Sequence, residues 1–399
     1  MKDVVLIGAF DRYNYGDNLM PIVFESFMKN FYPDFFSQGR LIFASLTASD
    51  LSNFKAKKTV SIASVFADEG PSPDVVIAVG GEILCASSST LYNHMGYKSF
   101  FSLIIKILTK FKFHSFANVL CRRFFRLPWE YPYIPIPTAA KKTAFNTVGG
   151  GVGRNNKEIV KHSVEQRLQD ADFISVRDTN TKNSLADIVA TDLYPDSVIA
   201  ISHFFSKDFL ECNSSRKIKL LKNKKYICVQ VAPKKAGAEV REYAKVLSNI
   251  KRRYGLSVIL CPIGYAAGHD DLRFLLSLKK EMGSDCDVLM DLSLWEIMFV
   301  ISQSSCFIGT SLHGVITALS YSVPYLGLNP KIRKLDSFLS DWGFGISNRC
   351  YSITEIFPLI AKVLDFDNEN YRNHSEKLVG LALENSHKLA RRLGLGAGN

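Results

Sequence analysis

The chain has 399 residues, more than one hydrophobic core usually organises, so two domains of roughly 200 residues are expected. Apolar residues make up 47% and charged residues 22%, and this balance excludes a disordered chain. The formal net charge of +11 favours anionic partners: a phosphorylated small molecule, an acidic membrane surface or nucleic acid.

Short apolar runs alternate with amphipathic helical segments, which is typical of parallel sheets flanked by helices. In the first half, strands are predicted over residues 4–8, 41–46, 60–63, 75–79, 143–148 and 173–176. In the second half, they are predicted over 226–231, 257–262, 287–290, 306–308 and 324–328. The sequence therefore predicts an α/β fold with two doubly wound Rossmann-like domains that face a cleft, a GT-B-like architecture.

A polar, basic stretch, KIKLLKNKK at 217–225, separates these halves. We predict an N-terminal domain over 1–216 and a C-terminal domain over 217–399. Residues 370–392 have the pattern of one long final helix, which could pack back on the N-terminal domain.

One segment interrupts the alternation. Residues 97–126 contain seven Lys or Arg and no Asp or Glu among many Phe, Leu and Ile, and a proline-rich stretch follows, so we place an insertion at about 97–137. Basic residues among bulky apolar ones suit the headgroup layer of an anionic membrane. The alternative is a buried pair of helices with solvated lysines. No apolar stretch reaches the roughly 18 residues of a spanning helix.

Loops at the predicted strand ends carry turn residues and glycines. The loop after the first strand contains Asn14 and Asp17, but it lacks the G-x-G-x-x-G pattern of a dinucleotide site. The strand 75–79 ends in Gly80 and Gly81, and a second glycine cluster begins at Gly149. Glycine permits close approach of a ligand to the backbone. Each cluster could be a tight turn alone, but two at one sheet edge favour a ligand crevice.

Cationic side chains follow two other strands. Arg177 comes directly after the strand 173–176, where a guanidinium could hold a carboxylate or phosphate through two hydrogen bonds. The alternative is a structural pair with Asp178. Lys234 and Lys235 follow the strand 226–231 and offer two ammonium groups, although lysines in such loops are often only solvated.

His313 stands where the strand 306–308 passes into a helix, preceded by Thr310 and Ser311 and followed by Gly314. A single histidine is more often structural. At a ligand-binding sheet edge, however, its near-neutral pKa suits proton transfer. The loop GYAAGHDD at 264–271 adds His269 and Asp271 to the same predicted edge.

Six stretches, in order, resemble the polysaccharide pyruvyl transferase family: NYGDNL, DVVIAVGGEIL, SVRDTNTKNSL, LYPDSVIAI, CPIGYAAGHDD and GTSLHGVITALSYSVPYLGL. Together they span about residues 4–330. The resemblance implies transfer of pyruvate from phosphoenolpyruvate to two hydroxyls of a sugar, which gives a cyclic ketal and free phosphate. Phosphoenolpyruvate is then a co-substrate, and neither a cofactor nor a metal is expected.

The resemblance also implies roles for individual residues. His313 and Arg177 are the expected catalytic residues. The donor is expected to contact Arg177, Lys234, Lys235, Ser311, Gly80 and Gly81, and the acceptor Asn14, Asp17, His269 and Asp271. Two positions depart from the family pattern: Ser311 stands where some relatives have Arg, and the loop GGGVGRNN replaces the usual ending of the middle glycine loop.

Two alternatives stay open: a GT-B-type glycosyltransferase that uses a nucleotide sugar, and a non-catalytic family member that only binds the donor. The expected partners are phosphoenolpyruvate and a saccharide acceptor of a surface glycan, which could be lipid-linked. The expected location is the cytoplasm. If the basic, apolar insertion binds a membrane, the protein would lie peripherally on the inner face of a bacterial membrane. Nucleic acid is not expected, because no nucleic-acid-binding motif is visible.

Overall fold

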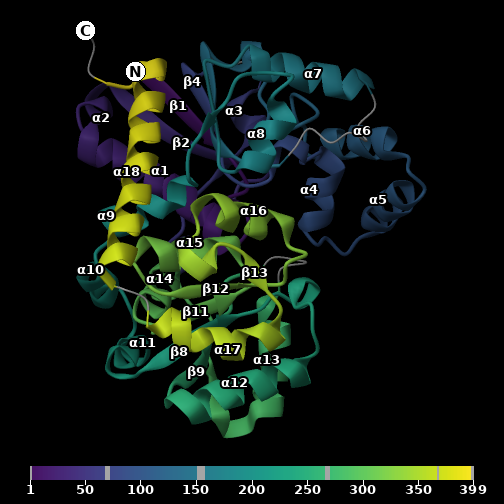
Figure 1. Ribbon diagram of the computed structural model, residues 1–399. Coiled ribbons are helices and arrows are strands. Elements are labelled where there is room, and N and C mark those ends of the chain that lie inside the picture. Colours follow the sequence, from purple (N-terminus) through teal and green to yellow (C-terminus); the bar gives the residue numbers. More distant parts are fainter. Residues whose placement is uncertain (1, 68–71, 151–157, 266–269, 366–367, 397–399) are drawn as a thin grey trace.

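The computed structural model describes residues 2–67, 72–150, 158–265, 270–365 and 368–396 (Figure 1). Its N-terminal half is built on a seven-stranded parallel sheet with the order β3-β2-β1-β4-β5-β6-β7. The strands are β1 (Lys2–Ile7), β2 (Gly39–Ser45), β3 (Val60–Ser61), β4 (Val75–Val79), β5 (Lys142–Val148), β6 (Phe173–Val176) and β7 (Asp192–Leu193).

The C-terminal half is built on a six-stranded parallel sheet with the order β10-β9-β8-β11-β12-β13. Its strands are β8 (Tyr226–Gln230), β9 (Ser257–Leu260), β10 (Cys286–Val288), β11 (Cys306–Gly309), β12 (Tyr325–Leu328) and β13 (Cys350–Tyr351). In each sheet the chain first winds outward on one side and then returns to the centre to wind out on the other. The prediction of two doubly wound Rossmann-like halves is therefore confirmed.

Helices flank both sheets. Those of the N-terminal half are α1 (Tyr15–Phe31), α2 (Phe35–Gln38), α3 (Ile62–Val65), α4 (Ser88–His94), α5 (Phe100–Lys110), α6 (His114–Phe124), α7 (Glu158–Gln169) and α8 (Thr179–Leu185). Three short helices lead to the second sheet: α9 (Ile201–Phe204), α10 (Lys207–Cys212) and α11 (Arg216–Lys219). The remaining helices are α12 (Val240–Tyr254), α13 (Asp271–Met282), α14 (Leu294–Ser302), α15 (Leu312–Ser320), α16 (Arg333–Trp342), α17 (Ile353–Leu364) and α18 (Asn368–Leu393). In the described part of the chain, no helix combines the length and apolar character needed to cross a bilayer.

The local sequence explains these elements. All five residues of β4 are buried, which is typical of an interior strand covered by helices on both faces. Helix α12 begins with a reciprocal cap between Glu239 and Glu242 and ends at Gly255 in the left-handed conformation. The predicted strand 60–63 is partly wrong, because only Val60–Ser61 pair as β3 and α3 starts at Ile62. Two edge strands of two residues each, β7 and β13, are too short to produce a recognisable sequence pattern.

Helix α18 runs along the side of both halves (Figure 1). Near its start, the Tyr371 hydroxyl donates a hydrogen bond to the Val323 carbonyl at 2.8 Å. Near its end, Asn385 donates to the Asn146 side chain at 2.7 Å. The helix therefore begins on the C-terminal half and ends on the N-terminal half.

Helices α1 and α15 also connect the halves, through a buried chain of hydrogen bonds. The hydroxyls of Tyr15 and Thr317 lie 2.8 Å apart, and the Thr317 hydroxyl donates to the His313 carbonyl at 2.7 Å. Since Thr317 donates its only hydroxyl proton to His313, Tyr15 is the donor to Thr317. The start of α15 is thus fixed relative to the start of α1.

We expect Tyr15→Phe to lower the free energy of unfolding by about 1 kcal/mol, because it removes one buried hydrogen bond and little packing. Denaturant unfolding measures this change. Tyr194→Phe is the control, because the Tyr194 hydroxyl donates to Glu384 in an exposed bond and its loss should change the free energy by less than about 0.5 kcal/mol. Equal effects of the two variants would show that the hydrogen bond between Tyr15 and Thr317 adds nothing to the free energy of unfolding.

Candidate functional site

A cavity of about 280 Å³ lies between the two halves. Its walls include the segments that follow β1, β4, β8 and β11, which are the central strands on either side of the reversal point of each sheet. Ligands of doubly wound folds bind at such points, where neighbouring loops leave in opposite directions. The polar and charged lining residues include Arg12, Asn14, Asp17, Glu82, Thr90, His94, Arg177, Gln230, Lys235, Asp271, Thr310, Ser311, His313 and Lys334.

His313 occupies the first turn of α15 and lines this cavity. The Ser311 hydroxyl caps the helix by accepting the Gly314 N–H at 3.3 Å. The imidazole ring packs directly on Gly16 in the first turn of α1, where a Cβ atom would lie only 1.8 Å from Nδ1. Any side chain at position 16 would displace the ring. His313 thus stands where the N-termini of two helices from different halves meet.

A buried carboxylate, Asp196, lies behind the imidazole. Its Oδ2 atom is 3.1 Å from Nη1 of Arg177 and 3.7 Å from Nε2 of His313, and its Oδ1 accepts the Val198 N–H at 3.1 Å. Burial alone would raise the pKa of Asp196, but His313, Arg177 and the Val198 N–H lower it to about 2. Asp196 is therefore an ionised group between a guanidinium and an imidazole, and it is placed to orient both.

Arg177 is only 2% exposed. Its guanidinium packs against Gly149, where a Cβ atom would lie 2.6 Å from Nε, and its backbone carbonyl accepts the Trp342 indole N–H at 2.8 Å from the other half. The structural partner considered for Arg177 was Asp178, but Nε lies 3.9 Å from that carboxylate, which instead caps α8 through the Thr181 N–H. Arg177 therefore lies within ion-pair distance of both carboxylates, and the pair considered with Asp178 is present but longer than the pair with Asp196.

The other predicted donor contacts differ in their placement. Lys235 lines the cavity, and burial together with the Lys334 ammonium lowers its pKa to about 8. Lys234 is exposed and is absent from the cavity lining, so the structure separates the two adjacent lysines. Gly80 and Gly81 both line the cavity with positive φ, +59° and +61°. The role of each residue in binding stays a prediction.

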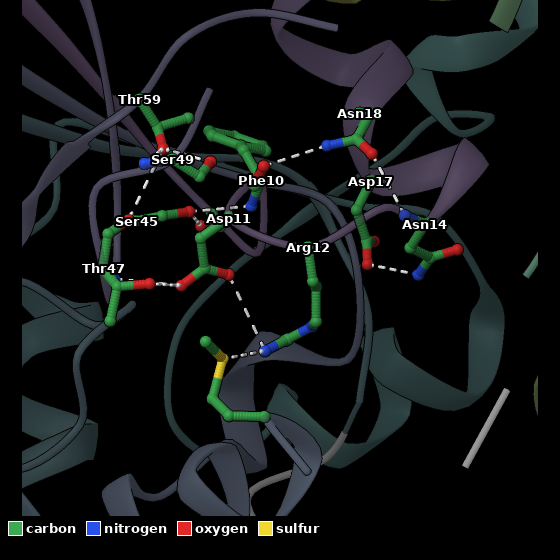
Figure 2. Close-up of polar contacts among 12 residues, drawn as sticks. Phe10, Asp11, Arg12, Asn14, Asp17, Asn18, Ser45, Thr47, Ser49 and Thr59 are labelled. Carbon is green, nitrogen blue, oxygen red and sulfur yellow. Dashed lines mark hydrogen bonds and ion pairs between the residues drawn. The ribbon is translucent and has the colours of Figure 1, made fainter. Parts of the chain in front are cut away.

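Two lining cations escaped the sequence analysis. Lys334, at the start of α16, forms an ion pair with Glu82 of the other half at 3.2 Å. Arg12 lies in the loop after β1, 3.8 Å from the Asp11 carboxylate, which accepts two hydrogen bonds from Thr47 (Figure 2). The sequence-based predictions for this loop named Asn14 and Asp17 but not Arg12. The position of Arg12 in the loop after the first predicted strand was the sequence feature that could have identified it as a cavity residue.

Three of the predicted acceptor contacts, Asn14, Asp17 and Asp271, line the cavity. The Asn14 amide donates to the Asp17 carboxylate at 2.5 Å at the start of α1 (Figure 2), and both side chains line the cavity. Asp271 also lines it, but its Oδ2 already accepts hydrogen bonds from the Gln230 amide and two backbone N–H groups. Burial raises the pKa of Asp271 to about 6, although these bonds lower it. His269 lies outside the described residues.

Asp196 is the main residue that sequence analysis missed. It belongs to the stretch LYPDSVIAI, which was read only as part of a family pattern, and its proximity to Arg177 and His313 depends on contacts far apart in sequence. In the described ranges, His, Cys, Asp and Glu side chains form no group of three or more that could hold a metal ion.

Replacing Asp196 should be costly at neutral pH. Asp196→Asn keeps an acceptor for the Val198 N–H but removes the closer carboxylate partner of the buried Arg177 and leaves only the longer contact with Asp178, so we expect a loss of about 3 kcal/mol of unfolding free energy at pH 7. The folded pKa of Asp196 is depressed, so its stabilisation is complete above about pH 4 and is lost as the pH falls toward 2. Denaturant unfolding of both proteins between pH 7 and pH 3 should show a constant difference down to about pH 4 that then shrinks. A difference that stays unchanged to pH 3 would contradict an ionised, paired Asp196.

Solved structures with a similar fold cover essentially the whole chain. A complex of S. aureus MnaA with UDP has 14% identity and a TM-score of 0.57, with 100% of both chains covered. The Neisseria meningitidis UDP-GlcNAc 2-epimerase bound to UDP-GlcNAc has 10% identity and a TM-score of 0.54, with 98% of this chain and 99% of that one covered. At these identities the likeness shows the fold alone. None of the curated proteins compared with the chain matches it.

The model of one family, polysaccharide pyruvyl transferase, matches residues 14–331. This range contains α1, all of the strands from β2 to β12, and both His313 and Asp196. The match covers most of the chain and includes the cavity lining described above except the segment before Asn14 and Lys334. The chain therefore belongs to the polysaccharide pyruvyl transferase family, whose members are transferases.

Proposed function

We propose that the protein transfers pyruvate from phosphoenolpyruvate to two hydroxyls of a saccharide, forming a cyclic ketal. The observation that supports this function best is the position of His313, at the junction of two helix N-termini, with the buried Asp196 carboxylate 3.7 Å from Nε2. We further propose that the reaction takes place in the cytoplasm and that the acceptor is a surface glycan or its lipid-linked precursor.

The cavity suits a small, multiply charged anion. Phosphoenolpyruvate carries about three negative charges at neutral pH, and one opposite charge about 4 Å away contributes roughly 4 kcal/mol at an effective dielectric constant of 20, before desolvation. The lining supplies Arg12, Arg177, Lys235 and Lys334, although the lining carboxylates Asp17, Glu82 and Asp271, and Asp196 behind them, offset part of this charge. The N-termini of α1 and α15 add unpaired N–H groups. We expect Lys235 to contribute directly, because its ammonium lines the cavity, where Asp271, Glu82 and Asp17 favour its charged form.

The reaction requires proton movements that one imidazole can serve. The methylene carbon of phosphoenolpyruvate gains a proton. The central carbon of phosphoenolpyruvate then forms bonds to two sugar oxygens, and its bond to the phosphate oxygen breaks. Of the two protons that the sugar hydroxyls lose, one accounts for the new hydrogen of the methyl group and the other is taken up by the released phosphate. His313 is proposed to deliver the first proton and to accept one from an attacking hydroxyl, while Asp196 keeps the ring in place.

A second hollow of about 430 Å³ adjoins the cavity and shares Glu82, Arg177 and Lys334 with it. Its other walls include Asn180 and Arg333, which offer hydrogen-bond donors on both sides. We propose that the saccharide acceptor extends from the cavity into this hollow. The acceptor would then approach the donor from the side of α8 and α16.

A nucleotide-sugar glycosyltransferase is the competing function, because the similar solved structures are described as bound to UDP or UDP-GlcNAc. The deciding experiment incubates the protein with phosphoenolpyruvate and a panel of lipid-linked or pyrophosphoryl glycans, and measures phosphate release together with a mass gain on the sugar. Thermal unfolding gives a parallel test, because a ligand at 100 times its Kd stabilises by about 2.7 kcal/mol. Stabilisation by nucleotide sugars alone would favour the glycosyltransferase, and binding of phosphoenolpyruvate without turnover would indicate a non-catalytic protein.

We expect His313→Gln to lower kcat by roughly 100-fold to 10,000-fold, the usual contribution of a general acid or base, while changing the Kd of phosphoenolpyruvate little. Steady-state kinetics and calorimetric binding separate these two effects. His203→Gln, at an exposed site away from the cavity lining, is the control and should be fully active. Normal turnover by the His313 variant would remove this residue from the mechanism.

Donor binding should weaken at alkaline pH. Lys235 has a lowered pKa of about 8, so its ammonium charge is present below pH 8 and is lost above it. The phosphate of the donor, with a second pKa near 6, does not titrate in that range. Calorimetry between pH 7 and pH 9.5 should therefore show the Kd rising through about pH 8 in the wild type. Lys235→Gln should bind phosphoenolpyruvate weakly, with a Kd that does not change with pH, whereas Lys234→Gln should behave as the wild type. The same dependence of Kd on pH in all three proteins would exclude Lys235 from the donor site.

A further inference from the structure

Helices α5 and α6 form a hairpin at the outer edge of the N-terminal half, beside α4 (Figure 1). Large apolar side chains project from it into solvent, with exposed fractions between 45% and 79%: Phe100, Ile107, Phe111, Phe113, Phe116 and Phe124. All seven Lys and Arg residues between positions 97 and 126 are exposed as well. We call these apolar and basic side chains together the hairpin surface.

The hairpin already has a separate inner face. Ile105, Ala117 and Cys121 are fully buried, and the Asn118 amide oxygen accepts the Ser89 N–H of α4 at 3.1 Å. Phe124 also packs on Tyr92 of α4, with ring centroids 5.3 Å apart, whereas no ring contact is found for the other exposed phenylalanines of the hairpin among the described residues. The expected alternative, a buried pair of helices with solvated lysines, therefore describes only the inner face.

We propose that the hairpin surface docks the protein on an anionic phospholipid bilayer. Phenylalanine rings insert at the boundary of headgroups and acyl chains, and lysine and arginine side chains extend along apolar surface to reach lipid phosphates. The segment has no acidic residue to oppose this attraction. Each basic residue near an anionic bilayer increases binding by about fivefold.

Helix α4 lies between the hairpin and the cavity. Helix α4, on which α6 packs, contributes Thr90, Leu91 and His94 to the cavity lining. A bilayer bound to the hairpin would therefore lie near the α4 wall of the cavity. This step rests on the proposed function, because it gives a saccharide on a lipid carrier a short path from the bilayer to the site.

The test is sedimentation of the full-length protein with vesicles of phosphatidylcholine alone or mixed with phosphatidylglycerol. We expect binding to the anionic vesicles at low salt, weaker binding at high salt, and little binding to phosphatidylcholine. The triple variant Lys106→Gln, Lys110→Gln, Lys112→Gln should bind roughly 100-fold less. The matched control changes three exposed lysines of the other half, Lys217, Lys224 and Lys225, to Gln and should bind as the wild type.

The apolar contribution needs its own variant. Phe111→Ser, Phe113→Ser and Phe116→Ser together should reduce binding at least tenfold, whereas Leu220→Ser with Leu276→Ser, at exposed sites of the C-terminal half, should not. Circular dichroism and gel filtration show whether each variant is folded and monomeric. Failure of the wild type to bind anionic vesicles overturns the proposal. So does a phenylalanine variant that loses self-association while its vesicle binding is unchanged, since the surface would then join copies of the chain.

Activity measurements separate this inference from the proposed function. With a water-soluble acceptor, the hairpin variants should release phosphate from phosphoenolpyruvate at the wild-type rate, because no altered side chain lines the cavity. With an acceptor embedded in anionic vesicles, they should be at least tenfold slower than the wild type. If the hairpin variants lose activity on both acceptors, a docking role is contradicted. If the wild type binds vesicles but has no transferase activity, docking is supported and the proposed reaction is refuted.

Discussion

The arrangement of the site depends on the contacts of the buried Asp196 carboxylate with Arg177 and His313. It is fully buried and belongs to the N-terminal half, yet it lies within 3.7 Å of the imidazole of the C-terminal half and within 3.1 Å of Arg177. A buried anion is tolerated only when opposite charge and hydrogen bonds compensate for lost hydration. Arg177 and the Val198 N–H supply this compensation at hydrogen-bond distance, and the imidazole lies next to the same carboxylate, so the relative position of the two halves is linked to the geometry around His313.

The backbone makes this geometry possible. The two sheets bring their reversal points together, so that four loops meet over one cavity. Glycines then allow the closest contacts: Gly16 gives room to the His313 ring, and Gly149 gives room to the Arg177 guanidinium. Tyr15 and Thr317 fix the starts of α1 and α15, which meet at the cavity. The catalytic and donor roles that we propose depend on this packing as much as on the charged groups themselves.

Much of the fold follows from local sequence, because buried parallel strands such as β4 and β11 are short apolar runs bounded by glycine and polar residues. The same pattern places His313 and Arg177 at sheet edges. It does not reveal which charges become partners, since Arg177 lies next to Asp178 in sequence but closer to Asp196 in space. Nor does it distinguish Lys234 from Lys235, because one residue along a loop decides whether an ammonium points to solvent or to the cavity.

A crystal structure of the protein with phosphoenolpyruvate is the most direct test of the central claim. The account predicts that the ligand lies in the cavity between the ends of β1, β4, β8 and β11, with its anionic groups within hydrogen-bond distance of Lys235 or Arg177. Its methylene carbon should face the ring of His313. Phosphoenolpyruvate bound outside this cavity, or bound inside it with the methylene carbon turned away from His313, would contradict the account.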